Sequence, residues 1–579
     1  MRFKNDTGSL KLYFVAGTQT VLMAFDLPEA KVKGSDFMGF SIERTDAEGK
    51  KQLLNGSKHF DSLIHDINIT DPKIKYASLV QAFFWKDYLA DPGQEYTYKV
   101  SAMYGTALHF APKYTSSITI STEELNKGKH SVYFNYGVTG SQGYAKNKEF
   151  GNKRVSELGK DAYAKALSYL SRELYNEGLT GFLKQAKTKK HSLYCAFYEI
   201  QYPEFLKQLK EVKKKVKELQ IVYSAQSGQN KDIKDPDHEK GNITSLKDTG
   251  LMSVSHLRTK ANQPHNKFMI LCENDVPIEV WTGSTNITLS GIFGQCNTGH
   301  WIKDKTIAKK YKKYWDTLKN NPSLGVLSKV SEEIQPDTDL TKLDNGTYVF
   351  FSPRDLPFDK DVEVTPNHLK SYVKLIDKAQ ELVCMIFPFN YDSVFQKVYD
   401  KKRSFLRYLL FEKTAQAEQA KSNEDNDVNL KVTGGAVLES KVEDFVKEVT
   451  PKSTVDGGIL FVHNKFFLVD PLSDQPKVLT GSANFSNASI VSNDENSLLI
   501  IGDKRVADIY LTEFNRLFEH FWPRYNTQQN KKNKIKNEAG FEKPLDEKYT
   551  WFVDYFKKSS YHYKRGRLFI EMKGAKKVQ

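Results

Sequence analysis

A histidine and a lysine two positions apart occur twice in this chain, and a Gly-Ser-x-Asn segment follows each pair. The members of the first copy are His265, Lys267, Gly283, Ser284 and Asn286. Those of the second copy are His463, Lys465, Gly481, Ser482 and Asn484, each 198 positions further on. A constant offset over five positions indicates an internal duplication, and it predicts one site with two-fold-like symmetry.

The sequence around each His-x-Lys pair favours a β-strand. Because side chains alternate between the two faces of a strand, the histidine and the lysine of each copy share a face. The glycine lets backbone approach a ligand closely, and the serine and the asparagine supply neutral donors. Two such halves facing each other would direct two lysines at negative charge and two histidines at opposite sides of a reacting atom. The pattern therefore predicts a pocket for an oxyanion.

This arrangement resembles the paired His-x-Lys-x4-Asp motifs of the phospholipase D superfamily, over roughly residues 155–525. The second copy fits in full, with Asp470 at the last motif position. The first copy has Cys272 at that position, with Asp275 nearby as a partial substitute. The resemblance implies two α/β repeats with mixed sheets flanked by helices, related by pseudo-two-fold symmetry. Since one chain carries both copies, we expect a monomer to suffice for the site.

The resemblance also implies cleavage of a phosphodiester through a phosphohistidine, without a metal or another cofactor. One histidine attacks phosphorus and the other protonates the departing oxygen, and water or an alcohol then resolves the intermediate. The predicted catalytic residues are His265, Lys267, Asn286, His463, Lys465, Asn484 and Glu495. The predicted substrate-binding residues are Ser284 and Ser482, and the predicted supporting residues are Asp470, Asn297, Gly283 and Gly481.

The two copies differ after the Gly-Ser-x-Asn segment, where Glu495 of the second corresponds to Asn297 of the first. In members of this superfamily a carboxylate or an amide near this position hydrogen-bonds a catalytic histidine. We expect Glu495 to support His463, and Asn297 or Gln295 to support His265. Because a carboxylate stabilises imidazolium, His463 would be the proton donor and His265 the nucleophile. This order of roles is similar to that of tyrosyl-DNA phosphodiesterases.

The pattern along the chain predicts a multi-domain protein. Residues 1–128 show short alternating stretches separated by turn residues, which predicts an all-β sandwich. Its segment Phe83–Ala102 resembles a fibronectin type III or immunoglobulin-like strand pair. Residues 129–345 and 346–528 then alternate strand and helix patterns, one phospholipase D-like repeat each. Residues 529–579 form a basic C-terminal extension.

Charge and composition favour an anionic partner. The chain of 579 residues has 85 Lys and Arg against 71 Asp and Glu, a net charge of +14. From Asn530 to Gln579 there are 14 basic and 6 acidic residues, interleaved with aromatics. That stretch fits either a solvated tail or a nucleic-acid groove. No apolar run reaches the ~20 residues of a membrane span, and the four cysteines have no paired spacing, so we expect a cytoplasmic protein without integral membrane association.

Three functions remain open from the sequence. The first is a phosphodiesterase acting on nucleic acid, which the net charge favours. The second is a phospholipid phosphodiesterase or phosphatidyl transferase, for which no strongly amphipathic segment is evident. The third is a catalytically impaired binding protein, in which the sandwich contacts an unknown partner; the intact histidines and lysines of both copies argue against it.

Overall fold

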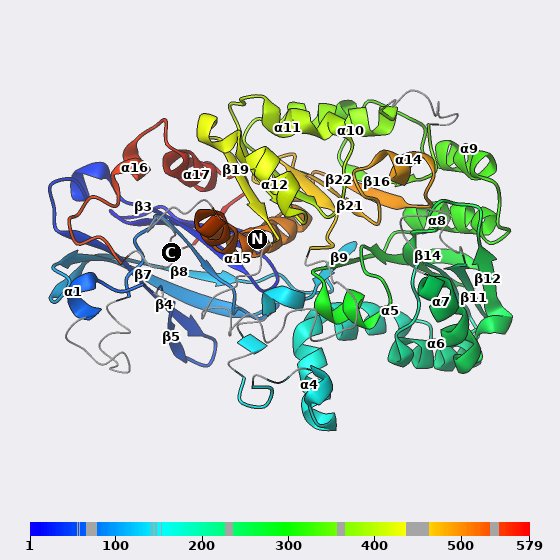
Figure 1. Ribbon diagram of the computed structural model, residues 1–579. Helices are drawn as coiled ribbons and strands as arrows, with labels where there is room; N and C mark the ends of the chain where they lie inside the picture. The colour runs from blue at the N-terminus through cyan, green and yellow to red at the C-terminus, as the bar shows by residue number, and fades with distance from the viewer. Residues whose placement is uncertain are drawn as a thin grey trace.

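The computed structural model describes most of the chain and divides it into a β-rich region and two α/β halves (Figure 1). The described residues are 1–54, 56, 58–64, 78–140, 143–144, 147–151, 153, 155–225, 236–355, 365–435, 462–532 and 544–578. Among these residues, no helix is both long and apolar enough to span a bilayer.

The N-terminal region consists of two β-sheets packed face to face. One has the order β23-β1-β2-β3-β6 and comprises β1 (Arg2–Asn5), β2 (Lys11–Ala16), β3 (Val21–Asp26), β6 (Phe84–Asp87) and β23 (Lys576–Lys577). The other has the order β5-β4-β7-β8 and comprises β4 (Phe37–Asp46), β5 (Lys51–Leu53), β7 (Glu95–Gly105) and β8 (Phe110–Ser121).

Aromatic side chains from both sheets form the core between them. The Phe14 ring lies 5.4 Å from that of Tyr98, and the Phe25 ring lies 4.9 Å from that of Phe40. This follows from the alternating apolar pattern, since every second residue of each strand points to the facing sheet. The more specific resemblance to fibronectin type III or immunoglobulin-like domains stays a prediction.

The two α/β halves have seven-stranded mixed sheets with the same strand order. The first is β12-β11-β10-β13-β14-β15-β9, with β9 (His130–Phe134), β10 (His191–Phe197), β11 (Glu218–Ser224), β12 (Ser255–Arg258), β13 (Lys267–Glu273), β14 (Val276–Gly283) and β15 (Thr298–Ile302). The second is β19-β18-β17-β20-β21-β22-β16, with β16 (Gly346–Phe351), β17 (Leu382–Phe387), β18 (Leu406–Phe411), β19 (Leu430–Gly434), β20 (Phe466–Val469), β21 (Lys477–Gly481) and β22 (Asn496–Ile501). The duplication in the sequence is therefore a duplication of the whole sheet.

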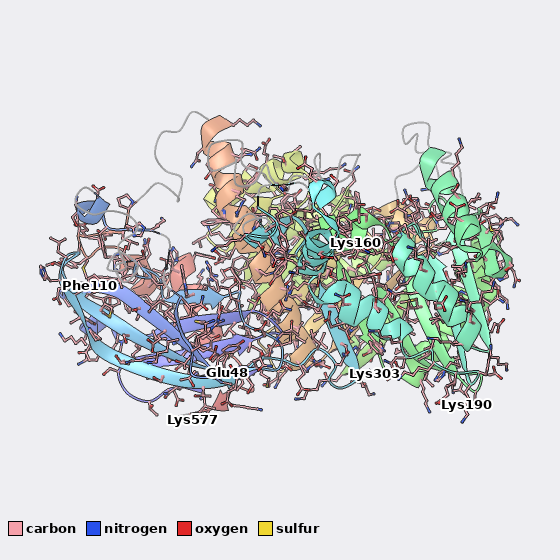
Figure 2. The ribbon with its side chains drawn as sticks, turned by 90° about the horizontal axis from the view of Figure 1, so that it is seen from below. Glu48, Phe110, Lys160, Lys190, Lys303 and Lys577 are labelled. Carbon is pink, nitrogen blue, oxygen red and sulfur yellow. The ribbon has the colours of Figure 1, made fainter. Side chains whose placement is uncertain are left out.

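Helices cover these sheets and join the halves. They include α4 (Lys160–Ser171), α5 (Thr180–Leu183), α6 (Pro203–Lys215), α7 (Pro236–Thr249), α8 (Lys305–Leu318), α9 (Leu324–Ile334), α10 (Asn367–Asp377), α11 (Lys397–Asp400), α12 (Thr414–Lys421), α14 (Asn487–Val491) and α15 (Lys504–Lys532). Helix α8 is capped by Asp304, the residue before its first turn, whose side chain accepts from two backbone N–H groups of that turn. Its buried face holds Ile307, Tyr311 and Trp315, four residues apart, and packs on β14 and β16. In Figure 2, α15 stands between the β-rich region and the first half.

The C-terminal extension is packed into the structure along its described residues, 544–578. It forms α16 (Val553–Phe556), α17 (Tyr561–Ile570) and β23. The rings of Trp551 and Phe552 join the core of the N-terminal sheets. The Arg565 guanidinium lies 3.6 Å from the centre of the Phe84 ring and donates to Glu519 at 3.0 Å. The described residues are therefore not a solvated tail, since Phe552 and Phe569 are buried and the other aromatics are partly buried. A role of the extension in binding nucleic acid stays a prediction.

The Arg2 side chain fixes the N-terminal sheet to the second half. It is 2% exposed and donates from Nε to the Asp508 carboxylate of α15 at 2.8 Å. Its two terminal nitrogens donate to the carbonyl oxygens of Leu472 and Pro471 at 2.8 and 2.6 Å. A buried guanidinium with this many acceptors binds its surroundings rigidly, because breaking any one contact leaves a buried donor unpaired.

Replacing Phe552 by alanine tests the structural role of the extension. Phe552 is 4% exposed, so Phe552→Ala should lower the free energy of unfolding by about 3–5 kcal/mol. The neighbouring Val553 is 51% exposed, and Val553→Ala should change it by less than about 1 kcal/mol. Urea denaturation followed by circular dichroism measures both. Equal losses in the two variants would contradict a packed extension.

Candidate active site

The two His-x-Lys pairs lie at the starts of equivalent strands. Lys267 is the first residue of β13, and Lys465 directly precedes β20. Both lysines are buried, and each Nζ donates to the carbonyl oxygen of the histidine in its own motif, at 2.7 Å in the first half and 2.9 Å in the second. These bonds position each ammonium beside its imidazole, as the shared strand face predicts.

Each histidine is oriented by a residue of the opposite half. His265 Nδ1 donates to the Glu495 carboxylate at 2.9 Å, and His463 Nδ1 donates to Asn297 Oδ1 at 2.9 Å. The predicted pairing, Glu495 with His463 and Asn297 or Gln295 with His265, was therefore wrong. Its physical reason is the path of the backbone, which carries the residues before β15 and β22 across the pseudo-two-fold axis.

Backbone hydrogen bonds across the axis establish this exchange. The N–H of His463 donates to the Cys296 carbonyl at 3.0 Å, and the N–H of Asp494 donates to the Gln263 carbonyl at 2.9 Å. Cys296 and Asp494 each directly precede an orienting residue, and Gln263 lies two residues before the histidine of the first half. The segment that carries Asn297 or Glu495 thus lies against the motif of the other half.

The two motif serines hold the orienting residues in place. Ser284 Oγ donates to Asn297 Oδ1, and Ser482 Oγ donates to Glu495 Oε2, each at 2.7 Å. Both serines are buried, so their hydroxyl groups are committed to protein partners. The prediction that they bind substrate needs correction. Each serine hydroxyl instead fixes the residue that accepts a hydrogen bond from Nδ1 of a histidine.

The two motif glycines are required by close backbone contact. Their φ angles are 151° at Gly283 and 155° at Gly481. A Cβ would lie 2.1 Å from the Thr298 carbonyl oxygen in the first half and 2.3 Å from the Asn496 carbonyl oxygen in the second. Any other residue would push apart the strands that carry the serine and its acceptor.

The motif aspartate is a structural residue outside the pocket. The Asp470 carboxylate accepts backbone N–H groups of residues 380–382, at 2.7–3.1 Å, and so fixes the start of β17. Its counterpart Cys272 is buried in an apolar cluster between β13 and α8. Asp275 is exposed and pairs with a surface lysine, so it does not take over the role of Asp470. The change to cysteine removes no reacting group.

Burial shifts the pKa values of the ionisable groups of the site. Burial lowers the pKa of Lys267 to about 7, and burial together with the charge of Lys267 lowers that of Lys465 well below its usual value. The pKa of His463 falls well below its usual range because of burial and of both lysines. Burial raises the pKa of Glu495 to about 8, with Lys267 opposing the shift. An oxyanion between the lysines would raise the pKa values of Lys267, Lys465 and His463 by stabilising their charged forms.

Two aromatic side chains lie against the histidine and lysine of each half and had not been predicted. The Tyr198 ring lies 4.8 Å from the His265 ring, and the Phe389 ring lies 5.6 Å from the His463 ring. The lysine of each half lies about 5 Å from the centre of the same aromatic ring. Both aromatics follow equivalent strands of their sheets, β10 or β17, and this shared place could have revealed them in the sequence.

The two motif asparagines keep hydrogen-bonding capacity at the pocket. Asn286 Nδ2 donates to the Glu199 carboxylate, a contact absent from the predicted site. The side-chain oxygens of Asn286 and Asn484 are buried and have no hydrogen-bond partner among the described residues. Buried amide oxygens usually find a donor, so both are suited to a bound group. Among all the residues that the structure describes, no three His, Cys, Asp or Glu side chains gather as a metal ligand set.

Comparisons with known proteins agree with this architecture. Residues 179–319 and 372–518 match the family described as "Cardiolipin synthase, PLD-like domain", one match in each half. No curated protein matches the chain. With the paired His-x-Lys motifs and the duplicated sheet, the two matches support the phospholipase D superfamily.

Three solved structures illustrate the likeness, all at low identity. Phosphatidylserine synthase of Haemophilus influenzae Rd KW20 is 12% identical, with a TM-score of 0.43, covering 60% of this chain and 85% of the synthase. Yeast tyrosyl-DNA phosphodiesterase is 13% identical, with a TM-score of 0.31, covering 56% of this chain and 88% of its own. Nuc of Salmonella typhimurium, a phospholipase D family member, is 22% identical, with a TM-score of 0.19, covering 24% and 86%.

Replacing Asp470 tests whether the motif aspartate is structural. Asp470→Ala removes a carboxylate that accepts several backbone N–H groups, so it should lower the free energy of unfolding by about 3 kcal/mol. Asp275→Ala is the matched control, since both residues have positive φ, 47° and 65°, but Asp275 has only an exposed ion pair. It should lose about 1 kcal/mol. Urea denaturation compares them, and equal losses would contradict the role given to Asp470.

Proposed function

We propose that this protein is a phosphodiesterase that cleaves nucleic acid through a phosphohistidine on His265. The observation that carries the proposal is the crossed pair of oriented histidines, each with a buried lysine beside it. Such a site offers a nucleophile, a proton donor and two cations for one phosphate, and residues of a single chain supply all of them. We accordingly propose that a monomer is active.

The nucleophile is His265. Because Nδ1 donates its proton to Glu495, the lone pair of the neutral ring lies on Nε2. As Nε2 bonds to phosphorus, positive charge develops on the ring, and the Glu495 carboxylate at 2.9 Å stabilises that charge. The role predicted for His265 is therefore kept, but for a different reason, since its acceptor is a carboxylate and not an amide.

The proton donor is His463. Burial and the two lysines lower the pKa of His463, so it is neutral at rest. An anionic phosphodiester next to it raises that pKa, and His463 becomes protonated. The bond from phosphorus to the leaving oxygen breaks as His265 Nε2 attacks, and that oxygen takes the proton. In the second step His463 removes a proton from water or an alcohol, whose oxygen bonds to phosphorus while the bond to His265 breaks. Lysines stand where other enzymes use a metal cation.

The net charge and the pocket walls support a nucleic-acid substrate. The chain carries +14, and the partly exposed rings of Tyr198 and Phe389 could stack with bases on either side of the phosphate. A phospholipid is the second candidate, favoured by the description of the matching family as cardiolipin synthase-like. A cytoplasmic location and an unknown partner of the N-terminal sheets stay predictions. A catalytically impaired binding protein fits less well, because both histidines retain their acceptors and their lysines.

Trapping of the covalent intermediate tests this function and its substrate. Two phosphorus-labelled substrates with a p-nitrophenyl leaving group, which needs no proton to depart, are compared in excess EDTA: an oligonucleotide p-nitrophenyl phosphodiester, and vesicles of phosphatidyl-p-nitrophenol. After an alkaline denaturing quench, His463→Ala should retain label, because no base activates water for the second step. His265→Ala should retain none. His191→Ala, a partly exposed histidine remote from the motifs, should turn over like the unchanged protein.

Mapping of the labelled peptide separates the alternatives. Label from the oligonucleotide on the peptide containing His265 supports the proposal. Label from phosphatidyl-p-nitrophenol alone would transfer it to the phospholipid candidate, and label on the peptide containing His463 would reverse the roles. Absence of label from both substrates, or loss of turnover in EDTA, would reject the metal-independent phosphohistidine mechanism.

The pH dependence of KM tests the role of Lys267. Its pKa of about 7 means that it is cationic below pH 7 and loses its charge as the pH rises. Attraction of an anionic substrate falls accordingly, so KM should increase about fivefold from pH 7 to pH 8. Lys267→Arg keeps its charge over this range and should flatten the increase. An unchanged pH profile in that variant would exclude Lys267 as the titrating group.

A further inference from the structure

The wall of the first half contains a carboxylate that the paired motifs do not include. Glu199 follows β10, is half-buried, and accepts a hydrogen bond from Asn286 Nδ2. The wall of the second half carries Phe389 in the loop after β17, the strand equivalent to β10. The two halves of the pocket therefore differ by one negative charge on their walls.

Glu199 is close enough to the phosphate-binding groups to act on them. Burial lowers the pKa of Lys267, and Glu495 and Glu199 both oppose that shift. Two lysines, Lys267 and Lys465, and two carboxyl groups, Glu199 and Glu495, lie among the motif residues. Binding of an anion thus depends on a balance between the attraction of the lysines and the repulsion of the Glu199 carboxylate.

Phosphate esters differ in charge in a way that this balance can detect. A diester carries one negative charge, whereas a monoester has a second ionisation near pH 6 and is a dianion at pH 8. The Coulomb energy between Glu199 and a ligand is proportional to the charge of the ligand. The repulsion of a monoester is therefore about twice that of a diester bound in the same place.

We propose that Glu199 is a specificity residue that selects phosphodiesters against phosphomonoesters and promotes release of the product. This inference rests on the proposed function, in which water resolves the phosphohistidine. In that step a new oxygen–phosphorus bond forms, the nitrogen–phosphorus bond to His265 breaks, and the proton of water passes to His463. The product is a phosphomonoester, and once it becomes a dianion Glu199 repels it more than the incoming substrate.

The variant Glu199→Gln isolates the charge. Glutamine keeps an oxygen that can accept from Asn286, so the shape of the wall is retained while the negative charge is removed. Diethyl phosphate and ethyl phosphate are titrated into the full chain at pH 8, with binding followed by phosphorus NMR. If the loss of repulsion tightens binding of the diester about threefold, it should tighten binding of the monoester about tenfold, because the energy doubles and the factor is squared.

Two further variants guard the interpretation. Glu204→Gln removes an equal charge from the exposed start of α6, where Glu204 pairs with Lys207, and should change neither affinity. Glu199→Asp retains the charge and should keep the unchanged protein's preference for the diester. Equal changes for both ligands in Glu199→Gln, or a lost preference in Glu199→Asp, would overturn the proposal. A failure of both ligands to bind the folded, unchanged protein would reject the phosphate site itself, and with it the proposed function.

Discussion

The crossed hydrogen bonds of His265 and His463 are the constraint on which the rest of the structure depends. Neither half can orient its own histidine, because the acceptor comes from the other half at 2.9 Å in both cases. Ionisable groups buried at this depth are unfavourable unless their partners are fixed, so the halves must stay in register. The Arg258–Asp494 ion pair, 2.7 Å long and fully buried, and the Tyr311 hydroxyl, which donates to Asn496 at 2.8 Å, lock the two sheets around the site.

Ion pairs in the outer layers of the molecule also hold the two halves in register. Helix α15 belongs to the second half, yet its Glu513 pairs with Arg172 of the first half at 3.0 Å. Its Asp508 pairs with Arg2 of the N-terminal sheet, and the described part of the C-terminal extension covers that sheet. Each of these ion pairs is buried and also hydrogen-bonded, which is the situation in which removal of one partner is most disruptive. The β-rich region is thus part of the scaffold of the site.

The sequence predicted which positions of the two halves are equivalent, but it did not predict which residues of the two halves are in contact. A constant offset identifies Gly283 with Gly481 or Asn297 with Glu495, and all these residues lie where the duplication places them. It contains no information about which half supplies an acceptor to which histidine, because that depends on how the halves face each other. The aromatic and basic residues after Asn530 were ambiguous for a related reason: a segment that packs against a sheet and a nucleic-acid groove use the same residue types. Glu199 was missed because β10 and β17 correspond with an offset of 190, so no motif marks the loop that follows.

In the proposed reaction both halves of the site contact the phosphate, so the direction of the reaction has to come from departures from two-fold symmetry. The backbone, the lysines, the serines and the glycines are repeated, and they cannot distinguish nucleophile from proton donor. Glu495 and Asn297 do distinguish them, because only a carboxylate stabilises the positive charge that forms on a phosphorylated imidazole. A neutral amide behind His463 fixes that ring without holding a proton on it, which suits a group that must give up a proton in one step and accept one in the next. In this proposal the duplicated fold supplies the binding of phosphate, and the differences between equivalent residues assign the two chemical roles.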